Sequence, residues 1–278
     1  MTEQLKNEID TAVKFLQAYA KGCNGSTIEL AYSGGKDSDV ILALARMASI
    51  DVVPIYKCTT IDPPGTIKHV MDNGVQIVRP KKNFFQLIEK KGFPVFNRRF
   101  CCDVLKEYKI HDHCILGIRA VESVKRKKRY TEPTGCRVFP KTESVEQVSP
   151  ILFWTDDDVA EFITHYDIRL APHYYRPDGS IDFSRRLGCM GCPLKPDNGK
   201  ADFIAHPKLV RAWLRAGKKF LDTHPNAQSQ WDSVYELFAF CVFFVRSNAD
   251  FPNNSNGVLF QTDWKKELEN YFKIDLTL

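Results

Sequence analysis

The stretch Ser33-Gly34-Gly35-Lys36-Asp37-Ser38 (SGGKDS) stands between an apolar run at 27–32 and a helical pattern at 40–48. Glycine permits the backbone angles of a tight turn and lets backbone N–H groups approach an anion closely. The amino terminus of the following helix adds unpaired N–H groups and a favourable dipole. The sequence therefore predicts a strand, a phosphate-binding turn and a helix in direct succession.

The side chains of this turn suit a nucleotide phosphate. Lys36 supplies a positive charge, and Asp37 supplies an oxygen ligand for Mg²⁺. Ser33 and Ser38 supply hydroxyl donors. The spacing differs from GxxxxGK[ST] and from GxGxxG, so the usual P-loop and dinucleotide interpretations are disfavoured.

Strand-like and helix-like segments alternate around the turn. Strands are predicted at 27–32, 51–56, 75–78 and 114–117, and helices at 1–22, 40–48, 66–73, 83–91, 101–109 and about 155–165. Pro54 indicates an edge or an irregular end in the second strand, because proline has no N–H. Alternation at this spacing is typical of βαβ units. We therefore expect a doubly wound, mainly parallel α/β fold of the Rossmann-like kind.

The composition and the predicted elements of the sequence change after residue 150. Residues 167–200 are rich in glycine and proline, and helices are predicted at 207–223, 229–246 and 263–272. We expect three parts, which are an N-terminal helix at 1–24, a nucleotide-binding α/β domain at 25–200 that includes the cysteine loops, and a helical C-terminal region at 201–278.

The composition is that of a soluble globular protein. Hydrophobic residues make up 44% of the 278 residues and charged residues 26%, which excludes a disordered or collagen-like chain. The longest apolar stretch, at 237–245, is about half of the ~20 residues that a membrane span needs. The first ten residues carry charges of both signs and resemble no signal peptide. We expect a cytoplasmic protein without membrane contact.

Positive charge is concentrated in one segment. The formal net charge is only +5, yet residues 119–129 (RAVESVKRKKR) hold six basic residues against one glutamate. Such a cluster attracts a nucleotide or a nucleic-acid backbone, although a solvated basic loop is an equally good interpretation of charge alone. The candidate nucleic-acid contacts are Lys125, Lys127, Lys128 and Arg129.

Nine cysteines without an export signal favour metal or redox chemistry over disulfides. Four of them form two pairs, Cys101-Cys102 and Cys189-Met-Gly-Cys192. The other five are isolated in the sequence, which is typical of cysteines that pack as small buried apolar side chains. They are Cys23, Cys58, Cys114, Cys136 and Cys241.

The SGGKDS turn resembles the PP-loop of the adenine-nucleotide α-hydrolases, which include ATP pyrophosphatases and the phosphoadenylyl-sulfate (PAPS) reductase family. Three further stretches resemble the reductase branch, namely TTIDPP at 59–64, GIRAVES…R at 117–126 and SPI…WTDDDV at 149–159. The resemblance covers about residues 28–195. It implies ATP as ligand, Lys36, Asp37 and Arg119 as catalytic residues, and further nucleotide contacts from Ser33–Ser38, Thr60, Asp62, Gly117, Arg119, Glu122, Ser123 and Arg126.

The two cysteine pairs resemble the [4Fe–4S] pattern of the adenylyl-sulfate reductases. Four thiolates can hold a cubane cluster, and tandem ligation by Cys101 and Cys102 is easier on a cluster than on one tetrahedral ion. A Zn²⁺ site with ligands Cys101, Cys102, Cys189 and Cys192 is the rival. A redox-active or sulfur-carrying thiol pair is a third interpretation.

The resemblance to the reductases is incomplete. Sulfonucleotide reductases use a cysteine in an ECGLH-like C-terminal tail, whereas this sequence ends in FKIDLTL and its last cysteine, Cys241, lies in an apolar run. We therefore expect an ATP-pyrophosphatase-type sulfur transfer to a nucleic acid, as in DNA phosphorothioation, with a sulfur donor protein such as a cysteine desulfurase. The alternatives are a PAPS or adenylyl-sulfate reductase and a non-catalytic nucleotide sensor.

Overall fold

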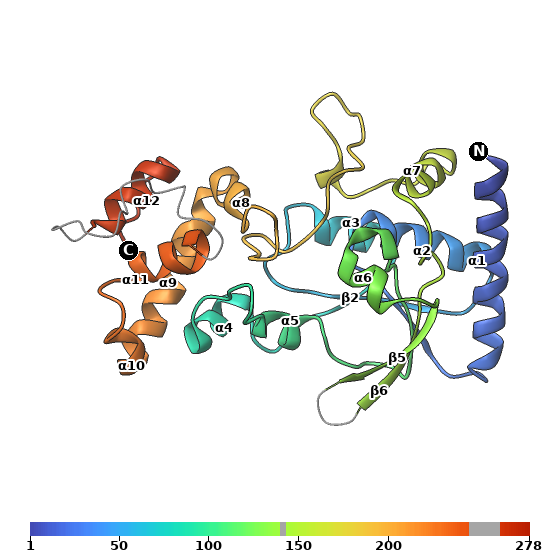
Figure 1. Ribbon diagram of the computed structural model, residues 1–278, viewed down its shortest axis with the longest axis horizontal. Coiled ribbons are helices and arrows are strands. Elements are labelled where there is room, and N and C mark those ends of the chain that lie inside the picture. Colours follow the sequence, from blue (N-terminus) through green and yellow to red (C-terminus); the bar gives the residue numbers. More distant parts are fainter. Residues whose placement is uncertain (140–142, 245–261) are drawn as a thin grey trace. The chain divides into compact units, whose positions relative to one another are not determined.

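A computed structural model describes residues 1–139, 143–244 and 262–278 (Figure 1). Its centre is a sheet of six strands in the order β3-β2-β1-β4-β6-β5. The strands are β1 (Ile28–Ala31), β2 (Val53–Lys57), β3 (Gln76–Val78), β4 (His113–Ile115), β5 (Thr134–Phe139) and β6 (Glu143–Val148). All neighbouring pairs are parallel except β5 with β6. The mainly parallel sheet is therefore confirmed.

An apolar row crosses the sheet at its middle. Leu30 of β1 pairs in register with Ile115 of β4, which pairs with Val148 of β6, and all three are completely buried. Strands buried on both faces need such continuous apolar stretches. β2 is an inner strand, but Pro54 is tolerated because β3 pairs with it only from Ile55 onward.

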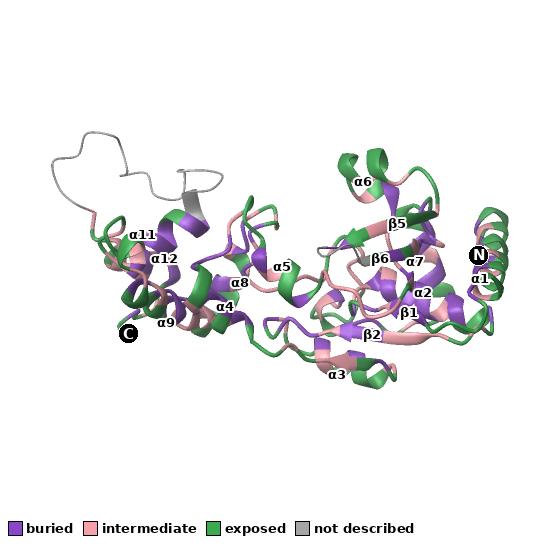
Figure 2. Ribbon diagram, turned by 90° about the horizontal axis from the view of Figure 1, so that it is seen from below, coloured by how far each residue is buried: buried purple, intermediate pink, exposed green. Residues whose placement is uncertain are grey.

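Helices cover this sheet in the first compact unit, which comprises residues 1–58, 62–79 and 107–188. α1 (Glu3–Gly22) buries Leu5, Ile9 and Leu16 at helical spacing, and α2 (Lys36–Met47) is mostly buried except for Arg46 and Met47 at its end (Figure 2). Thr155 and Asp158 form a reciprocal cap of α7 (Asp156–His165). The other helices of the unit are α3 (Thr66–Asp72), α6 (Val124–Arg129) and two short 3-10 turns, η1 (Ala120–Glu122) and η2 (Pro172–Tyr174).

The second compact unit comprises residues 59–61, 80–106 and 189–278. Its helices are α4 (Phe84–Lys91), α5 (Phe100–Leu105), α8 (Lys200–Ala205), α9 (Pro207–Thr223), α10 (Pro225–Gln228), α11 (Val234–Phe238), the π-helical η3 (Ala239–Phe244) and α12 (Trp264–Phe272). Trp213 is the centre of its core, with the rings of Phe93, Phe203 and Phe238 at centroid distances of 5.8, 5.1 and 6.3 Å.

The compact units follow different boundaries from the predicted parts. Both cysteine segments belong to the unit that contains the C-terminal helices, because α5 and the loop after residue 188 pack with them. The division into domains at 24 and 200 stays a prediction. The helix predicted at 229–246 starts only at Val234, where Ser233 caps α11, and residues 245 and 246 lie outside the described residues. Within the described ranges, no helix has the length and apolar character that crossing a bilayer requires.

Candidate functional site

The SGGKDS turn joins β1 to α2 in the first unit, as predicted. Gly34 has a φ of 76°, and a Cβ there would lie 3.2 Å from side-chain carbons of both Thr66 and Leu187. A side chain at this position is therefore disfavoured by conformation and by space. The Ser38 hydroxyl donates to the Gly35 carbonyl at 2.7 Å, and the Gly35 N–H donates to Ser33 Oγ at 3.3 Å. The turn is shaped by its own side chains.

Lys36 is buried at the first position of α2, with only 4% of its surface exposed. Its backbone N–H donates to the hydroxyl of Tyr174 at 3.0 Å, and that hydroxyl also accepts from Leu187 N at 3.4 Å. Burial lowers the pKa of the Lys36 ammonium, since desolvation penalises the charged form. Burial also raises the pKa of Tyr174 to about 12, so this phenol is protonated at neutral pH. Tyr174 was not predicted, because it lies 138 positions away in the sequence.

Arg119 is completely buried and connects two carboxylates. Its Nε donates to Asp37 Oδ1 at 2.6 Å, and its Nη2 donates to Asp156 Oδ1 at 2.7 Å. A Cβ on Gly117 would lie 3.0 Å from the carbonyl oxygen of Asp37, so the two chain segments touch. The structure thus brings Lys36, Asp37 and Arg119 to one place. Asp156 was predicted only as part of the WTDDDV stretch, and the hydrogen bond from Arg119 lowers its pKa.

Glu122 organises the neighbouring arginines. Its carboxylate forms an ion pair with Arg126 and lies 3.6 Å from Arg186 Nη1. Ser123 caps α6 by accepting from Arg126 N at 3.2 Å. Burial lowers the pKa of the Arg126 guanidinium. Glu122 and Ser123 therefore position arginine side chains, and their predicted contact with a nucleotide stays a prediction.

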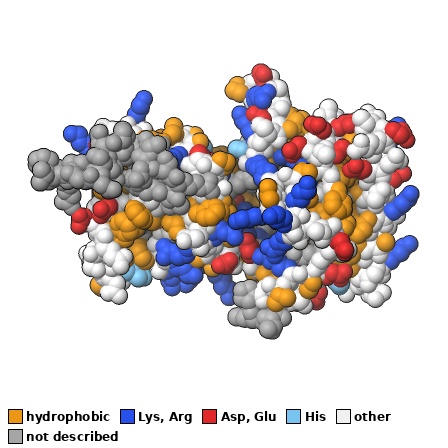
Figure 3. All heavy atoms as spheres, in the orientation of Figure 1, with side chains coloured by type: hydrophobic (Ala, Val, Ile, Leu, Met, Phe, Trp, Pro, Cys, Tyr) orange, Lys and Arg blue, Asp and Glu red, His pale blue; other side chains and the backbone are white. Residues whose placement is uncertain are grey.

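The remaining basic residues of α6 are exposed. Lys125, Lys127, Lys128 and Arg129 all lie at the surface, and Figure 3 shows Lys and Arg side chains gathered where α6 lies. Within the described part of the chain, the three lysines form no ion pair. They are free to contact phosphates.

A polar cluster lies beneath the phosphate turn and was not predicted. His69 Nε2 lies 3.0 Å from Asp39 Oδ1 and 3.0 Å from the hydroxyl of Tyr32, which itself donates to Asp39. All three side chains are buried. Burial raises the pKa of the Asp39 carboxyl. The cluster ties α2, which begins in the turn, to α3.

Two residues predicted to contact adenosine lie in different surroundings. Thr60 belongs to the second unit, where its Oγ1 accepts from Phe84 N at 2.8 Å and so caps α4. Asp62 belongs to the first unit, with its carboxylate 3.9 Å from the sulfur of Cys58. Their predicted role stays a prediction.

The four paired cysteines line one cavity of about 30 Å³ in the second unit. Cys101 and Cys102 come from α5, and Cys189 and Cys192 come from the loop before α8; apolar side chains, including that of Phe84, complete the wall. A hydrogen bond with Cys102, burial and the neighbouring thiols raise the pKa of Cys101. Two segments separated by 86 residues therefore place four thiols around a common space.

The second cysteine pair lies on a tightly fixed turn. Met190 N donates to the carbonyl of Ile61 at 2.9 Å, and Gly191 N donates to Asp202 Oδ2 at 2.8 Å. A Cβ on Gly199 would lie 2.5 Å from the backbone of Gly191. The turn thus requires glycine at 199, because two backbones touch there.

These residues suit a metal–sulfur group. The donors are all thiols, and their mutual repulsion as thiolates is relieved by bound iron or zinc. Within the described ranges, no three His, Cys, Asp or Glu side chains converge closely enough to hold one metal ion. The four thiols therefore match the donor set of a [4Fe–4S] cluster and that of a Zn²⁺ site alike.

A mainly parallel sheet with a glycine-rich phosphate turn between β1 and α2 defines a doubly wound α/β protein, a class that binds ligands at the carboxyl ends of its strands. The chain belongs to the phosphoadenosine phosphosulfate reductase domain family, whose family model matches residues 27–195.

Three individual proteins show more distant likeness. The uncharacterized protein MJ0973 of Methanocaldococcus jannaschii is 28% identical over 230 residues, which cover 75% of this chain and 52% of that protein. The chain therefore spans about half the length of this relative. FMN adenylyltransferase of Candida glabrata has a TM-score of 0.43 and 14% identity over 64% of this chain and 62% of its own. The U34-tRNA thiolase NcsA of Methanococcus maripaludis, solved with its [4Fe–4S] cluster, has a TM-score of 0.38 and 12% identity over 76% and 79% of the chains.

Proposed function

We propose that this protein is an ATP-dependent sulfurtransferase that acts on a nucleic-acid phosphate, as in DNA phosphorothioation. A nonbridging oxygen of the acceptor phosphodiester attacks the α-phosphorus of ATP, and pyrophosphate leaves with the bridging oxygen. Hydrosulfide, released from a persulfide donor protein by a thiol reductant, then attacks the acceptor phosphorus. AMP leaves with the oxygen that it gained, so the exchange at phosphorus needs no oxidant.

The residues of the first unit have distinct parts in this reaction. The N–H groups of the Ser33–Ser38 turn bind ATP phosphates at the start of α2. Lys36 and Arg119 balance the charge that builds up on the leaving pyrophosphate. Arg119 occupies one carboxylate oxygen of Asp37, and the other oxygen would hold Mg²⁺. The exposed lysines of α6 attract the acceptor backbone.

The observation that carries the proposal is that four thiols line one cavity in a chain with a complete phosphate turn. With one thiolate for each iron, a [4Fe–4S] cluster bound there would supply one-electron transfer and a cross-link between the two segments. Cys101, Cys102, Cys189 and Cys192 would hold it. A donor such as a cysteine desulfurase is the matching source of sulfur.

Cys241 supports sulfur transfer over the reductase alternative. It is buried, and burial raises its pKa to about 11. A thiol in this state is a poor nucleophile at neutral pH, so Cys241 is unsuited to attack the sulfur of a sulfonucleotide.

One assay separates the candidate functions. The anaerobically purified protein is incubated with Mg²⁺, an oligonucleotide, hydrosulfide and either ATP or PAPS. We expect AMP and pyrophosphate from ATP in equal amounts, together with an oligonucleotide heavier by the difference between sulfur and oxygen. Sulfite from PAPS would establish the reductase instead, and binding of ATP without turnover would establish a sensor. Asp37→Ala is the inactive control.

A further inference from the structure

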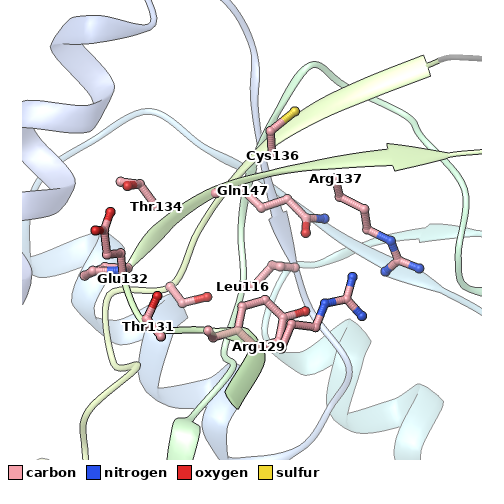
Figure 4. A pocket seen from close by; sticks show the side chains of 12 residues that line it. Leu116, Arg129, Thr131, Glu132, Thr134, Cys136, Arg137 and Gln147 are labelled. Carbon is pink, nitrogen blue, oxygen red and sulfur yellow. The ribbon is translucent and has the colours of Figure 1, made fainter. Parts of the chain in front are cut away.

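A pocket of about 200 Å³ opens in the first unit, beside the carboxyl ends of β4 and β6 (Figure 4). No sequence motif predicted it. Its walls come from the ends of these strands, from the start of β5 and from the segment that follows α6; the residues that matter below are Leu116, Arg129, Gly135, Arg137, Gln147 and Ser149.

One wall of the pocket is a position of β5 that carries no side chain. Gly135 stands directly opposite Gln147 in the antiparallel pair, and residues paired in this way project from the same face of a sheet. A Cβ on Gly135 would have no heavy atom within 4 Å. The space above Gly135 is therefore open, and Gln147 forms its side.

The lining offers recognition groups that lack partners in the protein. Within the described ranges, neither the amide of Gln147 nor the hydroxyl of Ser149 makes a side-chain hydrogen bond. Arg129 has no carboxylate partner there and lies 5.4 Å from the ring centroid of Tyr130, whereas Arg137 is paired with Glu107 at 2.5 Å. Figure 4 shows the Gln147 amide and both guanidinium groups on the same side of the pocket.

We propose that this pocket holds one unstacked base of the acceptor strand, an inference that rests on the nucleic-acid acceptor proposed above. The pocket is smaller than the roughly 300–1,000 Å³ of sites for drug-sized ligands, so it suits one ring system. The planar guanidinium of Arg129 stacks on a base, and the Gln147 amide donates to and accepts from its edge. Apolar Leu116 contributes to the wall.

The position of the pocket fits a strand that is being modified. Arg129 is the last residue of α6, so the exposed lysines of that helix lead directly to the pocket. Leu116 directly precedes Gly117, which lies against the main chain of Asp37 in the phosphate turn. The pocket wall and the phosphate turn are thus joined through one short segment, and we expect the phosphodiester of the bound nucleotide to lie near that segment.

Filling the pocket tests the proposal. Gly135→Val adds a β-branched side chain in open space on a strand, where it is well tolerated. Val138→Leu is the matched control, since Val138 lies on the same strand, is 68% exposed and lines no part of the pocket. Fluorescence anisotropy compares a single-stranded oligonucleotide with an abasic oligonucleotide of equal length and charge.

We expect the wild type and Val138→Leu to bind the base-containing strand roughly five- to a hundredfold more tightly than the abasic one. This is the gain in affinity that stacking of one base provides. Gly135→Val loses this preference, and Gln147→Leu reduces the discrimination among four homopolymers. Equal binding of both strands by the wild type would overturn the proposal that the pocket holds a base, but it would not contradict the proposal of a nucleic-acid acceptor. Failure of the wild type to bind either strand overturns the proposed acceptor itself. ATP binding by every variant verifies that the first unit is folded.

Discussion

The guanidinium Nε of Arg119 lies 2.6 Å from the carboxylate of Asp37, although 82 positions separate the two residues in the sequence. Asp37 follows β1 and Arg119 follows β4, and these two strands are parallel neighbours. Side chains after the carboxyl ends of adjacent parallel strands meet at one edge of a sheet. The ion pair therefore fixes the orientation of the Asp37 carboxylate before a nucleotide arrives.

Arg119→Lys should weaken the binding of Mg·ATP by roughly ten- to a hundredfold. Lysine cannot reproduce a fork that contacts Asp37 and Asp156 together, and each lost charge-assisted bond costs about 1.5–3 kcal/mol. Isothermal titration calorimetry measures the effect. Arg176→Lys, which changes an exposed ion pair with Asp182, is the control. Unchanged affinity for Mg·ATP in Arg119→Lys would contradict the role of the Arg119 guanidinium in orienting Asp37.

Tyr174→Phe should destabilise the protein by about 1–3 kcal/mol, because the N–H groups of Lys36 and Leu187 lose their acceptor. Urea unfolding measures the difference in the free energy of unfolding. Tyr166→Phe, which changes a more exposed ring, should alter it little. A variant as stable as the wild type would show that water replaces the hydroxyl.

Asp39→Asn should change how stability depends on pH. The folded state holds the Asp39 proton more tightly than the unfolded chain, because burial raises its pKa above the ordinary 3.8. Between these two pKa values the folded state binds more protons, so this group lowers stability as pH rises. Relative to the wild type, Asp39→Asn should therefore gain stability between about pH 4 and neutrality. Urea unfolding across that range measures it, with Asp10→Asn as a surface control; parallel curves would contradict the prediction.

The anaerobically purified protein should be brown and contain about four irons and four sulfides per chain. Cys102→Ala should lose the iron, whereas Cys136→Ala should retain it, since Cys136 is exposed on β5 and outside the cysteine cavity. Metal and acid-labile sulfide analysis measures both. One zinc without iron would replace the cluster with a Zn²⁺ site, and removal of either group by a chelator should lower the stability of the second unit.

Replacing Lys125, Lys127 and Lys128 with Gln should reduce the salt dependence of nucleic-acid binding by about one unit of log–log slope per lost contact. ATP affinity should change little. Filter binding over a salt series measures the slope. The control replaces Lys6, Lys14 and Lys21 of α1, which are equally exposed and remove the same charge. Equal slopes in the two triple variants would show that α6 is an ordinary solvated helix.

The alternation of strands and helices was predictable because parallel strands are buried on both faces. Their sequences are therefore nearly continuous apolar stretches. The β5–β6 hairpin escaped prediction for the opposite reason. Most of β5 is exposed, with Val138 at 68%, and only Phe139 at its end is buried. A polar edge hairpin leaves little periodic signal.

The residues of the candidate site likewise fall into those that the sequence predicted and those that it did not. Ser33–Ser38 and Arg119 lie in local motifs, so their positions could be read from the sequence. Tyr174 and His69 act through tertiary contacts to residues 138 and 30 positions away, with no local spacing that indicates a partner. The pocket beside Gln147 depends on a strand register that only the structure provides.

The boundaries of the two compact units, at residues 58, 61, 79, 106 and 188, have a consequence for synthesis on the ribosome. The chain passes repeatedly between the units before either is finished. α4 packs with α9, which begins at Pro207, so residues 80–106 must wait until most of the polypeptide has emerged. Cys101 and Cys102 therefore remain exposed to oxidants and stray metals while the 86 residues before Cys189 are made, and a shortened chain that stops before Cys189 lacks half of the thiols that line the cavity.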